Sequence, residues 1–262
     1  MWDMVVEGVQ RAFQSPTSWE SALIATSTIF VIAAPLLLVG LSVPGVLSAF
    51  VLGLLTFRAF GVQGTTIVFL YFLLGTGATK VKIKTKQEEG TAEKRGGRRG
   101  PSSVWGSGIA GTVCAVATIA GVGGPECQFL WQLGFLASFC TKLSDTISSE
   151  IGKAFGNTTY LVTTLSIVPR GTEGAVSVTG TLAGLFASIF LALVGLANHM
   201  TDVKGIITCV VAAQVANICE SIVGATLQGQ KGFKWLTNDV ANVLNITIGA
   251  TVAILLRLVL GH

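Results

Sequence analysis

The feature that most constrains this chain is a succession of long apolar segments in which charged residues are rare. Hydrophobic residues make up 51% of the 262 positions and charged residues only 11%, against about 25% charged residues in a typical soluble protein. The mean hydropathy is +0.71 over the whole length, and a soluble domain of this size would expose too much apolar surface to water. We therefore predict an all-α, polytopic transmembrane helical bundle that forms a single domain over residues 1–262.

Apolar runs and turn residues divide the chain into about seven or eight expected membrane spans. The expected helices cover residues 18–40, 44–57, 64–78, 102–120, 127–143, 178–197, 205–225 and 237–260. The second and third are short for a full crossing of about 20 residues, so they are tilted or partly buried in protein. The fifth continues into a polar segment, residues 144–152. Met1–Gln14 interleaves apolar and charged residues, which predicts an N-terminal amphipathic helix at the membrane interface.

One stretch, residues 79–102, carries most of the basic charge. Three glutamates oppose eight basic side chains there, so the stretch holds a net +5 against +4 for the whole chain. The positive-inside rule places this basic loop on the cytosolic side, or on the stromal side in a plastid. The basic residues are Lys80, Lys82, Lys84, Lys86, Lys94, Arg95, Arg98 and Arg99.

Several familiar site classes are not supported by the sequence. The five cysteines are scattered without a CxxC pair, which argues against zinc and against a disulfide framework. Residues 224–231 have one residue too many before Lys231 for a phosphate-binding P-loop. His199 is the only internal histidine, so no Ser-His-Asp arrangement is expected. No nucleic-acid partner is expected either.

Ionisable groups inside a bilayer are costly, so each is a candidate functional residue. Asp145, Ser149 and Glu150 follow the fifth apolar run; as a helix, Asp145 and Ser149 are neighbours, but Glu150 lies about 140° around the axis from Asp145. Asp145 and Glu150 can therefore bind one Mg²⁺ only if the helix ends or bends between them. The alternative is a solvated helix end.

Two further polar stripes interrupt apolar helices. Asn217 and Glu220 are three residues apart in the seventh expected helix, and Asp239, Asn242 and Asn245 repeat at the same spacing in the eighth. Hard oxygen ligands in this arrangement suit Mg²⁺. The alternatives are hydrogen bonds between helices and an N-cap at Asn238 or Asp239.

Basic and Gly-rich residues near the membrane predict phosphate binding. The candidates are Lys80 and Lys82 at one end of the basic loop, Arg98 and Arg99 at the other, and Arg170, Gly171 and Thr172 in a separate loop. For the middle of the basic loop, residues 84–94, attraction to anionic lipid and a role in topology are the favoured interpretation.

Seven motifs together resemble a known family. They are LGTGATK (74–80), RGGRRGP (95–101), SVWGS (103–107), SDTISSEIGK (144–153), PRGTEGAVS (169–177), ESIVGA (220–225) and NDVAN (238–242). In this order they resemble the integral membrane family that contains the plant and cyanobacterial phytyl phosphate kinase of vitamin E synthesis. The RGGRRGP and PRGTEG blocks favour the plant-type kinase over a eukaryotic transmembrane relative of unclear activity.

The resemblance implies transfer of the γ-phosphoryl group of a nucleoside triphosphate, CTP, to phytyl phosphate or another prenyl phosphate. Asp145, Glu150, Glu220 and Asp239 are then the expected catalytic residues and Mg²⁺ ligands. The expected substrate-binding residues are Lys80, Lys82, Arg98, Arg99, Ser149, Arg170, Gly171, Thr172, Asn217, Asn242 and Asn245. The expected location is a chloroplast envelope or thylakoid membrane in a plant or alga, or the cell or thylakoid membrane in a cyanobacterium, as a monomer or an oligomer.

Other functions stay open from the sequence. An ion-coupled membrane transporter would also need carboxylates within the membrane, although no internal repeat is visible. A prenyl alcohol kinase or a cytidylyltransferase would use similar groups on a related substrate. A lipid-binding or scaffolding protein would not depend on the carboxylates.

Overall fold

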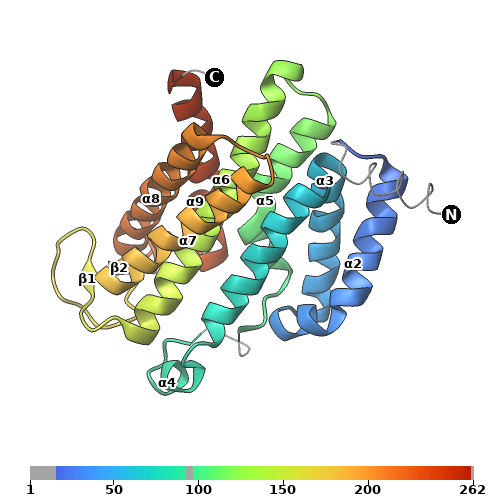
Figure 1. Cartoon of the computed structure of the whole chain (residues 1–262). Helices are drawn as coiled ribbons and strands as arrows, with labels where there is room; N and C mark the ends of the chain where they lie inside the picture. Colours follow the sequence, from blue (N-terminus) through green and yellow to red (C-terminus); the bar gives the residue numbers. More distant parts are fainter. Residues whose placement is uncertain (1–15, 93–96, 261–262) are drawn as a thin grey trace.

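The computed structural model describes residues 16–92 and 97–260 and confirms the predicted all-α bundle (Figure 1). Two short antiparallel strands, β1 (Tyr160–Leu161) and β2 (Ala175–Val176), pair in the connection between α6 and α7. The amphipathic helix predicted over Met1–Gln14 lies outside the described residues. The described helices are α2 (Trp19–Gly40), α3 (Val43–Lys80), α4 (Ile83–Glu88), α5 (Pro101–Ile119), α6 (Pro125–Phe155), α7 (Val178–Ala197), α8 (Val203–Thr226) and α9 (Asn238–Leu260).

Helix α3 consists of two arms that meet at Gly61. The φ of Gly61 is 56° and its ψ is −145°, a backbone conformation that glycine adopts without the steric penalty of a side chain. The chain reverses direction there, so Gly45 in the first arm and Gly75 in the second both lie against Arg99 (Figure 1). The two short helices predicted over residues 44–57 and 64–78 are thus confirmed.

The lengths and hydropathies of the described helices agree with the predicted membrane spans. Six of them, α2, α3, α5, α7, α8 and α9, are long and apolar enough to span a bilayer. Counting the two arms of α3 separately gives seven candidate spans among the described residues, within the predicted range, and α6 is a further long helix of 31 residues. The sequence of α6 is less apolar because charged residues lie near both of its ends.

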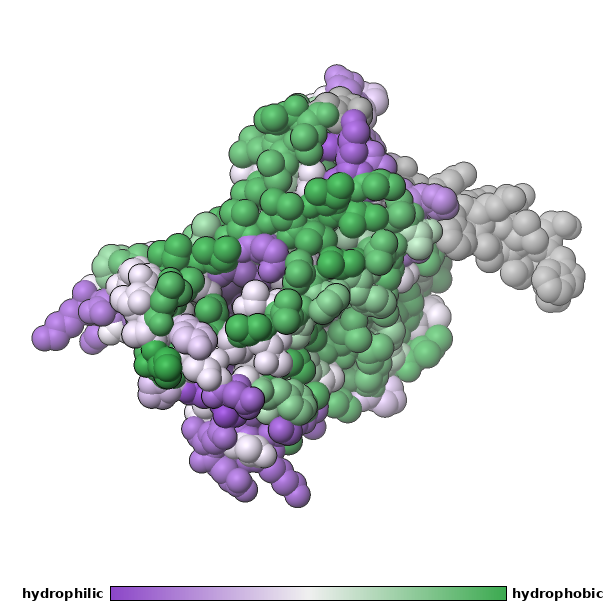
Figure 2. Space-filling model, turned by 60° about the vertical axis from the view of Figure 1, so that its left-hand side comes forward, coloured by the Kyte–Doolittle hydropathy of each residue, from purple (hydrophilic) through white to green (hydrophobic). Residues whose placement is uncertain are grey.

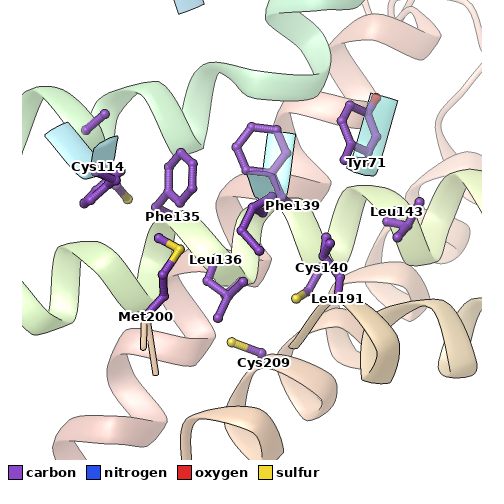
Figure 3. Packing of buried hydrophobic residues seen from close by; sticks show 14 of the residues in the cluster. Tyr71, Cys114, Phe135, Leu136, Phe139, Cys140, Leu143, Leu191, Met200 and Cys209 are labelled. Carbon is purple, nitrogen blue, oxygen red and sulfur yellow. The ribbon is translucent and has the colours of Figure 1, made fainter. Parts of the chain in front are cut away.

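Helix α6 forms the centre of the bundle. It contacts α3, α5, α7, α8 and α9, and every residue from Leu133 to Ser144 is buried. Figure 3 shows Phe135, Phe139 and Leu143 of α6 surrounded by side chains of neighbouring helices. The helix continues without a break to Phe155, so the polar segment after residue 143 extends inside the bundle.

Small residues allow α7 to pack closely against this central helix. Gly180 and Gly184 have the spacing typical of close helix pairs in membranes. A Cβ added at Gly180 would lie 2.5 Å from the carbonyl oxygen of Ser148, and one at Gly184 would lie 2.7 Å from that of Ser144. The polar half of α6 is therefore held against α7 by backbone contact.

Three connections gather at one end of the bundle: residues 81–100, 156–177 and 227–237 (Figure 1). The described part of the predicted basic loop contains α4 and Arg99, whose backbone forms two hydrogen bonds. The Arg99 N–H donates to the carbonyl oxygen of Gly40 (2.8 Å), and the Ser42 N–H donates to that of Arg99 (3.0 Å). This end, called the loop end below, carries the candidate site.

Candidate functional site

A polar cavity of about 1170 Å³ opens at the loop end of the bundle. Its wall combines the last turns of α6 and α8, the first turns of α5, α7 and α9, and residues of the two long connections. All four predicted carboxylates line it. Figure 2 shows hydrophilic atoms at the bottom of a hollow in a mainly apolar face.

Two of the carboxylates, Asp145 of α6 and Glu220 of α8, come together. They interact with each other, and both interact with Lys142. The Lys142 ammonium lies 2.5 Å from the Asp145 carboxylate and 2.6 Å from Oδ1 of Asn242. Because Lys142 is 5% exposed, this charged group depends on these partners for its hydrogen bonds.

Amide side chains connect the pair to neighbouring helices. Nδ2 of Asn245 donates to the Glu220 carboxylate and, at 3.1 Å, to Oδ1 of Asn217. Nδ2 of Asn217 donates to Oγ of Ser144 at 2.9 Å. Asn245 is fully buried, and its Oδ1 has no hydrogen-bond partner among the described residues. Behind the cavity wall, Asn245 thus holds Glu220 through its amide nitrogen and keeps a buried, unpartnered acceptor oxygen on the same amide group.

The other two carboxylates are held separately. Glu150 is 3% exposed and forms an ion pair with Lys86 of α4, whereas Asp239 accepts a hydrogen bond of 2.9 Å from Ser103. Because α6 neither ends nor bends between Asp145 and Glu150, the condition for a shared ion at these two residues is not met. Among residues 16–92 and 97–260, no three acidic, histidine or cysteine side chains form one metal-binding group.

Most of the predicted phosphate-binding residues line the cavity. They include Arg98, Arg99, Arg170, Gly171 and Thr172, together with Ser149, Asn217 and Asn242. A guanidinium N–H of Arg99 donates to the hydroxyl of Tyr71 at 2.8 Å. Arg170 donates to the Lys153 carbonyl oxygen at 3.1 Å, which holds its loop over the end of α6.

Lys80, Lys82 and Asn245 do not line the cavity, so the structure does not place these three predicted substrate-binding residues in its wall. The Lys82 ammonium donates to the carbonyl oxygen of Ala154 at 3.2 Å and lies 4.1 Å from the centre of the Phe155 ring. Lys82 therefore caps the C-terminal end of α6, where a cation is favourable.

Sequence reasoning missed two lysines. Lys86 lies in the part of the basic loop interpreted as a lipid-attracting surface, but it is 1% exposed and bonds to Glu150 and to the carbonyl oxygen of Thr79. That interpretation is wrong for Lys86. Lys142 appears in the sequence only as a charge near Asp145. Its position at the end of an apolar run was the one available signal.

Comparison with known proteins agrees with this architecture. Residues 26–250 match the family described as integral membrane protein DUF92. The chain is 57% identical to Protein VTE6, chloroplastic, of Arabidopsis thaliana, over 98% of this chain and 77% of that protein. It is 46% identical to an uncharacterized membrane protein of Synechocystis, over 90% of each chain. It is 29% identical to one of Methanocaldococcus jannaschii, over 81% of this chain and 84% of that protein. No solved structure matches. Because the family match extends over most of the bundle, the chain belongs to the DUF92 family of integral membrane proteins.

Proposed function

We propose that this protein is a prenyl phosphate kinase that transfers the γ-phosphoryl group of CTP to phytyl phosphate and releases phytyl diphosphate, for tocopherol synthesis and phytol salvage. The observation that carries the proposal is the cavity, whose wall presents a carboxylate pair and several cations at one end of a membrane bundle. The motif resemblance supports the reaction class. The chloroplast location of the Arabidopsis relative supports a chloroplast membrane, envelope or thylakoid, for this protein.

The size of the cavity supports a reaction between two phosphorylated substrates. Pockets for one drug-sized ligand have volumes of about 300–1,000 Å³, and this cavity is larger, at about 1170 Å³. A nucleoside triphosphate and the head of a prenyl phosphate both carry several negative charges. Their close approach requires cations in the wall, and Arg98, Arg99 and Arg170 supply them.

The residues around Asp145 fit a Mg²⁺ ion. Mg²⁺ commonly takes one or two protein carboxylates and completes its shell with water and substrate phosphates, so a third acidic ligand is not required. Asp145 and Glu220 supply the carboxylates, and Asn245, whose amide also carries the unpartnered Oδ1, holds Glu220 from behind the cavity wall. Bound there, the ion would neutralise charge on the phosphates.

The protein's own residues bind and orient the reactants. The acceptor is already a phosphate anion, so alignment with the donor matters more than removal of a proton. Lys142 holds the Asp145 carboxylate in place and presents its ammonium to the transferred group. In this proposal Glu150 and Asp239 support the wall, because each is engaged with a residue of another segment.

A product assay tests the proposal. Purified protein in nanodiscs receives Mg²⁺, one of four nucleoside triphosphates, and either phytyl phosphate or phytol, and mass spectrometry identifies the product. We expect phytyl diphosphate with CTP. We expect Asp145→Asn and Glu220→Gln to lower kcat by about a hundredfold, the scale of losing an electrostatic contact to the transition state. Glu126→Gln is the matched control, because Glu126 lies in the first turn of α6 at the opposite end of the bundle.

Other outcomes would identify other functions. Phosphorylation of phytol alone would indicate a prenyl alcohol kinase, and a cytidylylated lipid would indicate a cytidylyltransferase. An ion-coupled transporter would give substrate flux into liposomes without any product. Full activity in Asp145→Asn and Glu220→Gln would contradict the proposed site.

A further inference from the structure

Residues of α7 and α8 form one side of the polar cavity. Leu185 of α7 and Ile218 of α8 both line the cavity. Ile218 is 53% exposed and also continues, at helical spacing, the exposed apolar row of Ile207, Val211 and Val215 on the outer face of α8. A residue that contacts both the cavity and the outside marks an opening. Figure 2, in which the left-hand side of Figure 1 comes forward, shows a hollow with hydrophilic atoms next to an apolar surface.

The side chains at the rim of the opening are apolar, although the interior of the cavity is polar. Leu182 and Phe186 of α7 are 49% and 66% exposed, and Ile222 of α8 is 42% exposed. Asn217 and Glu220 of α8 line the interior only a few residues away. Both α7 and α8 are long and apolar enough to span a bilayer, so exposed apolar side chains along them would face lipid. A water-soluble ligand gains nothing from such a rim, whereas an amphiphile matches both surfaces.

We propose that the opening between α7 and α8 is a lateral portal through which the prenyl phosphate acceptor reaches the site from the bilayer. The phosphate enters the polar cavity, and the prenyl chain stays between Leu185 and Ile218 and in the surrounding lipid. This inference rests on the proposed function. It assigns different routes to the two substrates, because the nucleotide arrives from water at the loop end. Because much of the chain remains in lipid, additional isoprene units change binding little.

A second apolar space is a poorer location for the chain. It lies between α2, α3 and α5, touches Arg99 and has a volume of about 100 Å³. A cavity of about 150 Å³ holds one benzene molecule, so this space would accommodate little more than one isoprene unit.

Bulky substitutions at the rim test the portal. Ile218→Trp and Leu185→Trp narrow it from opposite sides. Ile207→Trp is the matched control, since Ile207 is 57% exposed and lies three helical turns earlier on the same face of α8. The acceptors are phytyl phosphate and the short, water-soluble dimethylallyl phosphate. For both rim variants we expect kcat/KM with phytyl phosphate to fall about tenfold, the equivalent of 1.4 kcal/mol. Activity with dimethylallyl phosphate and the KM for CTP should stay within about twofold of wild type, since these substrates use the loop end.

Two results would overturn the portal. One is equal activity of the rim variants and Ile207→Trp on phytyl phosphate; the other is an equal loss on both acceptors in the two rim variants. Photo-crosslinking gives a readout that does not need turnover. A prenyl phosphate with a diazirine on its chain should label α7 and α8, whereas labelling of α2 and α3 would assign the chain to the smaller apolar space. Failure of wild-type protein to phosphorylate any acceptor would refute the kinase proposal, and the labelling pattern would still decide the route.

Discussion

Removing the Lys86 ammonium should destabilise the protein strongly. Lys86 and Glu150 are 64 residues apart in sequence, and both are almost fully buried. The ammonium also donates to the carbonyl oxygen of Thr79 at 2.9 Å. This group therefore ties α4 to the end of α3 and to the central helix α6.

The loss of stability in each variant depends on which of the two charges stays buried without its partner. Breaking a buried ion pair by removing one partner costs about 3–5 kcal/mol, because the remaining charge is uncompensated, whereas replacing both partners by apolar groups is often nearly neutral. Lys86→Met leaves the Glu150 carboxylate buried, so we expect a loss of about 3–5 kcal/mol. Glu150→Leu should cost less, because Lys86 keeps a hydrogen bond to Thr79. The double variant should recover much of the loss.

The assay is equilibrium unfolding in mixed micelles with increasing SDS, followed by circular dichroism. Lys84→Met is the matched control, since Lys84 is exposed on the same short helix. A Lys86→Met variant within about 1 kcal/mol of Lys84→Met would refute the reasoning, since that is the range of a surface ion pair. Activity of the stable double variant then separates two roles of Glu150: we expect turnover to be retained, whereas a catalytic carboxylate would leave a folded, inactive protein.

Two further predictions concern packing and pH. Gly184→Leu should lower the melting temperature through a loss of about 1–3 kcal/mol, because the α6 backbone is too close for a side chain; Gly77→Leu, with open space around it, should have little effect, and similar losses in both would contradict the close packing. Partial burial would raise the pKa of Asp202, but hydrogen bonds from Arg257 and the Gly205 N–H outweigh it, so the pKa lies below 3.8. A lowered pKa means that the ion pair stabilises the fold fully above pH 3.8 and is lost as pH falls below that value. Melting temperatures of wild type should therefore fall more steeply in acid than those of Asp202→Asn, and parallel curves would count against the ion pair.

The candidate site could be predicted only in part. The sequence identified Asp145, Glu220 and the arginines as unusual for a membrane protein, and the cavity wall contains them. The sequence also suggested that Asp145 and Glu150 could share one Mg²⁺ ion, on the condition that the helix ends or bends between them. The unbroken α6 separates them, and Asp145 pairs instead with a carboxylate 75 positions later on α8.

Hydropathy and local spacing alone determined the class of fold, the approximate bounds of the spans and the basic connection. The reason is that a bilayer penalises any segment whose backbone N–H and C=O groups are not hydrogen-bonded within the protein, as they are in a helix. Only the tertiary structure decided which charge meets which. Lys142 donates a hydrogen bond to Asn242, which lies 100 residues later in the sequence. Lys86 belongs to a hydrophilic segment that looks exposed in the sequence, but it forms a buried ion pair with Glu150. Such pairings depend on how helices are arranged around α6. That arrangement follows from how glycines and side chains of neighbouring helices fit together. This fit depends on two helix surfaces at once, so the sequence of one helix does not predict it.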